Sequence, residues 1–167
     1  MAKRGYRGKH PHDDMKVSKH SESITKRNPK LDEEYAKLHP KQKYSYIRDH
    51  QGFFPQATAT VVCHASIAED QEITLISTDG TSKTYIGKTS ENLGSNHFKS
   101  DGNATVTATS LHDCIVHASG HNGKILSSDS GDGTLTLTQA EPGPDGNSTI
   151  TSDFHSDATV PSAFTGG

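Results

Sequence analysis

The residue types most suited to metal chemistry are two cysteines with histidines close by in the sequence. Cys63 is followed directly by His64, while Cys114 precedes His117 and His121. Thiolate and imidazole are preferred zinc ligands, and four of them make a tetrahedral site. The chain has no tight Cys-x-x-Cys pair, however, and its eleven histidines make chance spacings common. We therefore predict no metal site, and expect two reduced, partly buried thiols.

A second candidate for chemistry is the stretch "SSDSGDG", which looks like the beginning of a calcium loop. Aligning Gly133 with the glycine of such a loop leaves Ser128, Ser130 and Asp132 as early ligands. Gln139 then stands where the loop needs a bidentate glutamate. This set carries too little negative charge for calcium, so a glycine-rich hairpin turn is the better interpretation.

Patterns typical of enzymes are not evident. "GDGTL" is not followed by the Lys-Ser/Thr of a phosphate loop, and no Ser/His/Asp set or carboxylate pair stands out in so polar a chain. Asn103 and Asn147 begin glycosylation patterns, which matter only in a eukaryotic secretory route. The sequence predicts a protein that is not an enzyme and that needs no cofactor.

The composition limits how large a core the chain can build. Hydrophobic residues make up 29% of 167 residues, tryptophan is missing, and the mean hydropathy is -0.74. Such a chain forms a thin core, and partners supply further contacts. No window approaches the roughly 18 apolar residues of a membrane span, and the N-terminal residues lack the apolar region of a signal peptide. We expect neither a membrane protein nor a secreted precursor.

Charge divides the chain into two parts. Residues 1–54 contain 13 Lys/Arg and 7 Asp/Glu, a net of +6, whereas residues 55–167 contain 4 and 13, a net of -9. The first part is rich in Lys, His and Pro, and the second in Thr, Ser and Gly. The change falls near "GFFPQ" (52–56) and predicts an extended, mostly irregular basic arm (1–54) followed by a β domain (55–167).

The arm is predicted to be a docking segment. "NPKLDEEYAKLHP" favours a short helix near 29–39, residues 42–54 form an aromatic cluster, and residues 1–27 have nothing to bury. We expect basic and apolar side chains of the arm to contact a partner: Arg4, Arg7, Lys9, Lys26, Arg27, Tyr35, Leu38, Tyr44, Tyr46, Ile47, Arg48, Phe53 and Phe54.

The second part is predicted to be mainly β, either a sandwich-like or an α+β module with one short helix. We expect a strand within 57–67, a hairpin over 73–87 that turns at Asp79-Gly80, and a strand at 103–110. A helix at about 110–119 should start at Ser110 and stop at Gly120. A second hairpin that turns at Gly131–Gly133 and a strand within 147–154 should follow. The predicted core is Ile73, Leu75 or Ile76, Ile86, Leu111, Ile115, Ile125, Leu135, Leu137 and Ile150.

Several stretches of this part resemble a known class of protein. "ITLISTDGTSKTY", "HNGKI", "LTLTQAEPGPDGNSTIT" and "FTGG" resemble a small β-rich module of virion structural proteins from tailed bacteriophages, marine ones especially. The resemblance covers about 70–167 and leaves out the arm, and "SLHDCIVHASG" departs from the smoother Ala- and Leu-rich helix of that class. It implies a particle component that is made in the host cytoplasm and located in the virion, rather than an enzyme.

The leading hypothesis is therefore a capsid decoration, or cement, protein whose arm docks on the major capsid protein or on other copies of the chain. A neck, tail or fibre-base protein is one alternative. Another is a host-surface module that binds glycans, for which 55–167 offer only four aromatic residues: Tyr85, Phe98, Phe154 and Phe164. Nucleic acid is a second candidate partner for the arm, but its basic residues are dispersed and mixed with seven acids, which favours a protein surface.

Overall fold

A computed structural model describes residues 37–38 and 54–167, and Lys37 and Leu38 form a turn and a bend. The rest of the arm, including nearly all of the helix predicted near 29–39, lies outside the described residues. From Phe54 onward the elements are β1 (Thr58–Cys63), β2 (Glu72–Ile76), β3 (Ser82–Lys88), β4 (His97–Lys99), α3 (Ala104–Val116), β5 (Ile125–Asp129), β6 (Thr134–Gln139), β7 (Thr151–Ser152) and β8 (Ala158–Thr159), with 3-10 turns at Leu93–Ser95, Pro144–Gly146 and His155–Asp157.

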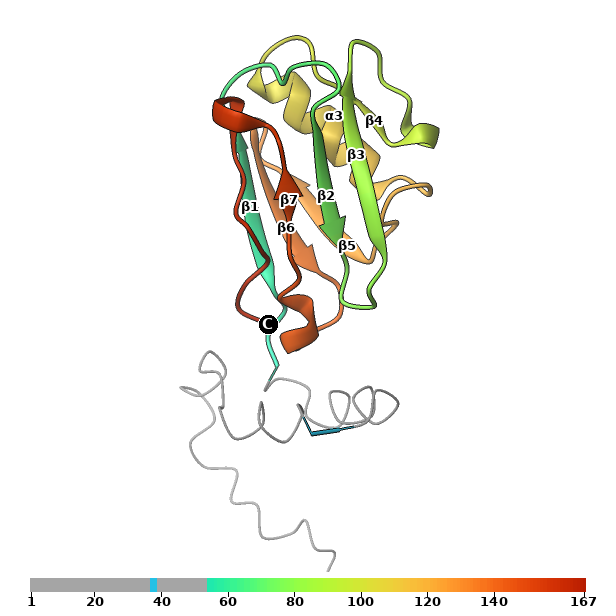
Figure 1. Ribbon diagram of the computed structural model, residues 1–167, viewed down its shortest axis with the longest axis vertical. Helices are drawn as coiled ribbons and strands as arrows, with labels where there is room; N and C mark the ends of the chain where they lie inside the picture. The colour runs from blue at the N-terminus through green and yellow to red at the C-terminus, as the bar shows by residue number, and fades with distance from the viewer. Residues whose placement is uncertain (1–36, 39–53) are drawn as a thin grey trace, which may run out of the picture.

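The strands form two four-stranded sheets that face each other (Figure 1). One sheet has the order β5-β6-β1-β8 and the other β4-β3-β2-β7, and all pairings are antiparallel except β3 with β4. The helix α3 packs on the edge strands β4 and β5, so it closes one side of the sandwich. The prediction of a mainly β domain with one helix is confirmed for the described residues.

Strict alternation of side chains builds the first sheet. In β1 and β6 the threonines face water, while Ala59, Val61, Leu135 and Leu137 point inward. The register pairs Ala59 with Leu137 and Val61 with Leu135, so the apolar residues of the two strands meet on one face. Because successive side chains of a strand point to opposite faces, "TATV" and "TLTLT" suit a sheet that is wet on one side only.

The hairpin of β2 and β3 is confirmed, but one core prediction in it is wrong. Ile73 and Leu75 are buried as expected, whereas Ile86 is only half-buried and Tyr85 takes the inner position. Neighbouring residues of a strand face opposite sides, so Tyr85 and Ile86 cannot both be inside. The inner site suits tyrosine because its ring fills the core and its hydroxyl finds a hydrogen-bond partner there.

The helix begins six residues earlier than predicted, and the strand expected at 103–110 is wrong. Asn103 caps α3, since its side chain accepts a hydrogen bond from the Val106 amide at 3.0 Å. The alternating threonines favour a strand. The Asn103 cap and the burial of Thr107, Leu111 and Cys114 on one face of the helix outweigh that preference. Ser110 lies inside the helix, where its hydroxyl accepts from the Lys99 amide at 2.7 Å and donates to a glutamate.

Gly120 does end this region, although α3 itself stops at Val116. A Cβ at position 120 would lie 2.1 Å from the carbonyl oxygen of Cys114, so the chain can fold back under the helix only with glycine here. The remaining strands are shorter than predicted, at Thr58–Cys63 and Thr151–Ser152, whereas the hairpin of β5 and β6 turns at Gly131–Gly133 as expected.

Leu135 provides a test of this register because its side chain is fully buried between the sheets. We expect Leu135→Ala to lower the free energy of unfolding by about 2–5 kcal/mol, since it removes buried methyl groups and leaves a cavity. The adjacent Thr136→Ala, on the wet face of β6, is the matched control and should change it by less than about 0.5 kcal/mol. Urea unfolding monitored by circular dichroism measures both, and equal effects would contradict the assigned faces.

Candidate functional site

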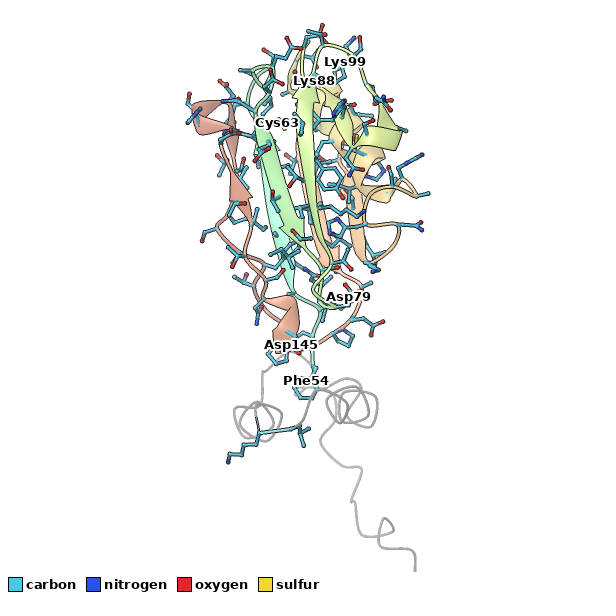
Figure 2. All side chains as sticks on the ribbon, turned by 45° about the vertical axis from the view of Figure 1, so that its right-hand side comes forward. Phe54, Cys63, Asp79, Lys88, Lys99 and Asp145 are labelled. Atoms are coloured by element: carbon cyan, nitrogen blue, oxygen red, sulfur yellow. The ribbon has the colours of Figure 1, made fainter. Side chains whose placement is uncertain are left out.

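One end of the sandwich brings together the root of the arm, a pocket and three of the six buried polar residues of the described chain, Ser77, His121 and Gln139. We call this end the base; it comprises the β2–β3 turn (77–81), the segment 121–124 before β5, the segment 140–148 after β6, and the arm root (54–57). Figure 2 shows Asp79, Asp145 and Phe54 at this end, with Lys88 and Lys99 at the opposite end. The base is therefore the end of the domain from which the arm leaves.

The arm root is held firmly to the base by main-chain and side-chain hydrogen bonds. The Gly143 amide donates to the Pro55 carbonyl at 3.0 Å, and the Gln139 amide donates to the Ala57 carbonyl at 2.9 Å. The Gln56 side-chain amide reaches across to the Ala140 carbonyl at 2.8 Å. These bonds fix the direction in which the chain enters β1.

Of the residues predicted to contact a partner, only Leu38 and Phe54 fall within the described residues. Leu38 is half-buried, and Phe54 at the arm root is 5% exposed. Phe54 in this state presents little surface to a partner. The other predicted contact residues, Arg4, Arg7, Lys9, Lys26, Arg27, Tyr35, Tyr44, Tyr46, Ile47, Arg48 and Phe53, lie outside the described residues.

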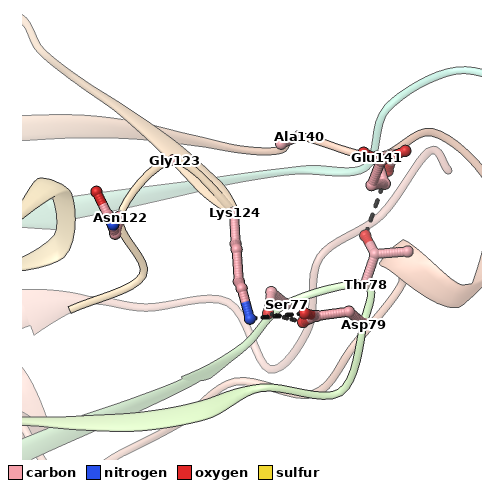
Figure 3. Close-up of a pocket in the computed structure, with 8 residues that line it drawn as sticks. All are labelled: Ser77, Thr78, Asp79, Asn122, Gly123, Lys124, Ala140 and Glu141. Atoms are coloured by element: carbon pink, nitrogen blue, oxygen red, sulfur yellow. Dashed lines mark hydrogen bonds and ion pairs between the residues drawn. The ribbon is translucent and has the colours of Figure 1, made fainter. Parts of the chain in front are cut away.

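A half-open pocket of about 350 Å³ lies at the base between the two sheets (Figure 3). Its lining comes from three segments whose residues are mostly of polar type: Ser77, Thr78, Asp79, Asn122, Gly123, Lys124, Ala140 and Glu141. Ala140 is the residue whose carbonyl binds Gln56, so the pocket adjoins the arm root. Asn122 and Gly123 adopt positive φ angles of 46° and 85°, which places this Asn-Gly pair in a tight turn at the rim.

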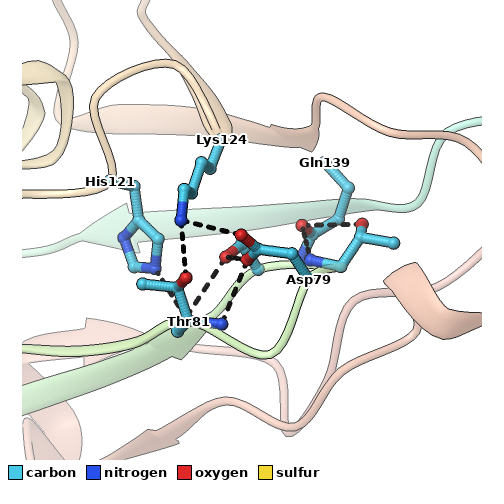
Figure 4. Close-up of polar contacts among 7 residues, drawn as sticks. Asp79, Thr81, His121, Lys124 and Gln139 are labelled. Atoms are coloured by element: carbon cyan, nitrogen blue, oxygen red, sulfur yellow. Dashed lines mark hydrogen bonds and ion pairs between the residues drawn. The ribbon is translucent and has the colours of Figure 1, made fainter.

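An ion pair crosses the pocket and joins the β2–β3 turn to the chain before β5 (Figure 4). Lys124 Nζ lies 2.7 Å from Asp79 Oδ2 and also donates to Thr81 Oγ1 at 2.7 Å. Asp79 further accepts from the Ser77 hydroxyl at 2.6 Å and from the Thr81 amide at 3.1 Å. The hydrogen bonds from Lys124 and Ser77 hold the pKa of the Asp79 carboxyl well below its ordinary value, so it stays ionised.

Beneath this ion pair, His121 and Tyr85 form a buried hydrogen-bonded pair. Tyr85 Oη lies 2.6 Å from His121 Nδ1, and His121 Nε2 lies 3.3 Å from the Thr81 carbonyl oxygen. A carbonyl only accepts, so Nε2 carries the proton and Nδ1 accepts from the tyrosine hydroxyl. Burial lowers the pKa of His121, and burial likewise raises the pKa of Tyr85, so both groups stay neutral.

Gln139 ties the two sheets together at the same end. Its side chain is fully buried, its Oε1 accepts from the Thr78 amide at 2.9 Å, and its Nε2 donates to the Ile76 carbonyl at 2.9 Å. Gln139 Nε2 also donates to the Ser148 hydroxyl at 3.1 Å. Neither Gln139 nor the His121–Tyr85 pair was identified from sequence, because partners 36 to 63 residues apart leave no local pattern.

The structure separates the residues considered for zinc. His117 Nδ1 lies 2.8 Å from the Ser119 hydroxyl, His121 binds Tyr85, and His64 Nε2 lies 2.7 Å from the Thr159 hydroxyl. Both cysteines are free, and both are buried where only partial burial was predicted. In residues 37–38 and 54–167 no three His, Cys, Asp or Glu side chains lie close enough to hold a metal ion.

The stretch considered for calcium forms the turn between β5 and β6. Asp129 accepts from the Gly131 amide at 2.8 Å and Asp132 from the Thr134 amide at 3.0 Å, while Gly131 and Gly133 adopt φ angles of 79° and 93°. These carboxylates therefore cap main-chain amides of the turn. The interpretation as a glycine-rich hairpin turn is confirmed.

All four aromatic residues that follow Pro55 belong to the core. Tyr85, Phe98, Phe154 and Phe164 are each at most 1% exposed, and the rings of Phe98 and Phe154 pack edge to face at 5.8 Å. A flat sugar ring stacks on exposed aromatic faces, and none of these four residues presents one.

Comparisons with protein-family models, with curated proteins and with solved structures find no match to this chain. Along the described residues, no helix combines the length and the apolar character that a membrane crossing requires.

The two thiols offer a direct test of the site assignments. Burial, together with the nearby Asp129 carboxylate, raises the pKa of Cys63 to about 11, and burial, together with Glu91 and Asp113, raises that of Cys114 to about 12. Because the thiolate is the reactive form, neither cysteine should react with a thiol reagent near pH 8 while the protein is folded. Spectroscopic titration with a disulfide reagent should give two equivalents in denaturant and a negligible amount without it. Rapid reaction of the native protein would contradict the assignment.

Proposed function

We propose that this protein is a non-enzymatic structural component of a tailed-phage virion, a decoration protein that docks by its N-terminal arm on the major capsid protein. The observation that carries the proposal is the division of charge between a +6 arm and a -9 domain. A basic segment that precedes a self-contained acidic domain suits attachment to an acidic protein surface through the segment. The resemblance of residues 70–167 to virion modules supports the particle as the location.

Exposed acids lie at both ends of the domain. Five exposed acids belong to loops at the end opposite the base: Glu69, Asp70, Asp101, Asp132 and Asp153. Two lysines at that end pair with acids, Lys88 with Asp70 and Lys99 with Asp101 at 3.7 Å. The base also carries exposed acids, Asp79, Glu141 and Asp145. We therefore orient the base toward the capsid only because the arm leaves from this end.

The two alternative functions are not equally well supported. A neck, tail or fibre-base protein would use the same arm on a different partner, and the copy number in an intact particle separates the two. Many copies over the head indicate decoration, and a single ring indicates a neck or tail position. A glycan-binding module has less support, because the four aromatic side chains that would form a sugar platform are buried.

Deletion of residues 1–54 tests the docking role of the arm. We expect the truncated chain to keep the β domain folded, since the core from Ala57 onward forms one cluster, and to lose binding to particles. Co-sedimentation with particles that lack the protein measures binding, and circular dichroism confirms folding. As a control, the full-length Thr136→Ala variant should bind normally. A folded truncated domain that still attaches at full occupancy would refute the arm hypothesis.

The dependence of binding on salt separates a protein partner from nucleic acid. On an acidic protein surface, salt should slow association, because exposed charges more than about 10 Å apart are screened at ~0.1 M. Apolar contacts from the arm should keep bound protein attached at high salt. Nucleic acid predicts a log-linear loss of affinity with salt and a mobility shift of free DNA by the arm. Tight DNA binding without particle binding would replace the proposed partner.

A further inference from the structure

His121 is the one histidine of the described residues that is buried, at 1% exposure. It belongs to the segment between α3 and β5, and its ring fills the space between this segment and β3. Both ring nitrogens are used, Nδ1 by the Tyr85 hydroxyl and Nε2 by the Thr81 carbonyl. The site is therefore built for a neutral imidazole in one tautomer.

A second proton would conflict with this site in two ways. Nδ1 would become a donor, so the Tyr85 hydroxyl would have to accept from it, and the tyrosine proton would lose its acceptor in a fully buried position. The ring would also carry a charge into a region with little water. Burying an unpaired charge and an unsatisfied donor are both costly, which favours a conformation that exposes the ring.

The charged groups around the ring come from each element that packs on it, and they do not offset this cost. Lys83 on β3 and Lys124 on the same segment repel an imidazolium, while Asp79 on the β2–β3 turn attracts one. Asp79 is already paired with Lys124 at 2.7 Å. Tyr85 and, behind it, Cys114 on α3 are neutral neighbours because burial raises both of their pKa values.

The segment that carries His121 is also one wall of the base pocket. Asn122, Gly123 and Lys124 face Ser77, Thr78 and Asp79 across that pocket (Figure 3). Contacts from His121 and Lys124 to Thr81 and Asp79 hold the two walls together (Figure 4). At the tip of this wall, a Cβ on Gly123 would meet nothing within 4 Å. A ring leaving the core would carry this wall outward.

We propose that His121 is an acid-sensitive latch of the base, and that its protonation expels the ring from beside Tyr85 and opens the pocket next to the arm root. The latch does not depend on the identity of the partner. The direction of the pH response follows from burial. Burial holds the pKa of His121 in the closed form below its ordinary value of 6.5, so the closed form is stable at neutral pH. Its stability begins to fall as the pH drops below 6.5 and is lost as the pH falls through the pKa of the closed form.

Hydrogen–deuterium exchange of the full chain, from about pH 7.5 to about pH 4.5 with correction for intrinsic rates, tests the latch. We expect segments 117–124 and 77–81 to lose protection as the pH falls, while β1 and β6 keep theirs. In His121→Gln, the side-chain amide can still donate to the Thr81 carbonyl but cannot titrate, so the acid-induced loss should disappear. His155→Gln, at an exposed histidine, is the matched control and should behave like the unmodified protein.

Two further measurements test the latch without relying on the His121→Gln variant. Tyr85→Phe removes the hydroxyl that stabilises the neutral ring, so the midpoint of local opening should move to higher pH; a purely structural role of Tyr85 would leave that midpoint unchanged. NMR titration of the imidazole in the unmodified protein gives its pKa without any substitution. The latch is refuted by full protection of both segments across the range, by simultaneous loss of protection throughout the domain, or by the same acid response in His121→Gln.

Discussion

A single apolar layer between two sheets is the constraint on which the rest of this domain depends. With 29% hydrophobic residues, the chain can cover only one face of each strand, so most of its large apolar side chains point inward, with Ile86 and Leu126 among the exceptions. Alternation in β1, β2 and β6 achieves this, and α3 adds Leu111 and Ile115 to the open side. The outward threonines follow from this arrangement, since they suit a strand while leaving the wet face polar.

At the end of the apolar layer, hydrogen bonds rather than apolar contacts hold the two sheets together. At the base the two sheets are joined by the amide of Gln139, by the His121–Tyr85 pair and by the Lys124–Asp79 ion pair. None of the buried side-chain polar atoms in the described residues is without a partner. A fully hydrogen-bonded end fixes geometry well, but the bonds of His121, Asp79 and Lys124 depend on the protonation state of these side chains, so they respond to pH in a way that apolar contacts do not.

Local patterns predicted the β hairpins and eight of the 21 buried apolar residues of the described chain, because turn residues and period-two alternation act over a few residues; the buried aromatic residues were not among them. Asp79-Gly80 and Gly131–Gly133 form turns where the sequence places them. The errors arose where local preference competes with tertiary context: alternating threonines at 103–110 favour a strand, yet the Asn103 cap and the burial of one helical face decide otherwise. The base was not predictable, since Gln139 and His121 find their partners through the fold and neither differs locally from a surface residue.

The outer strands of both sheets have a consequence for how the protein behaves when crowded. Strands β4, β7 and β8 are only two or three residues long, and α3 packs along β5, so no long row of unpaired main-chain groups faces solvent in the described domain. Edge-to-edge joining of sheets is the usual route from a β domain to aggregates, and it needs such a row. The described domain is therefore poorly suited to joining another copy edge to edge, even at high local concentration.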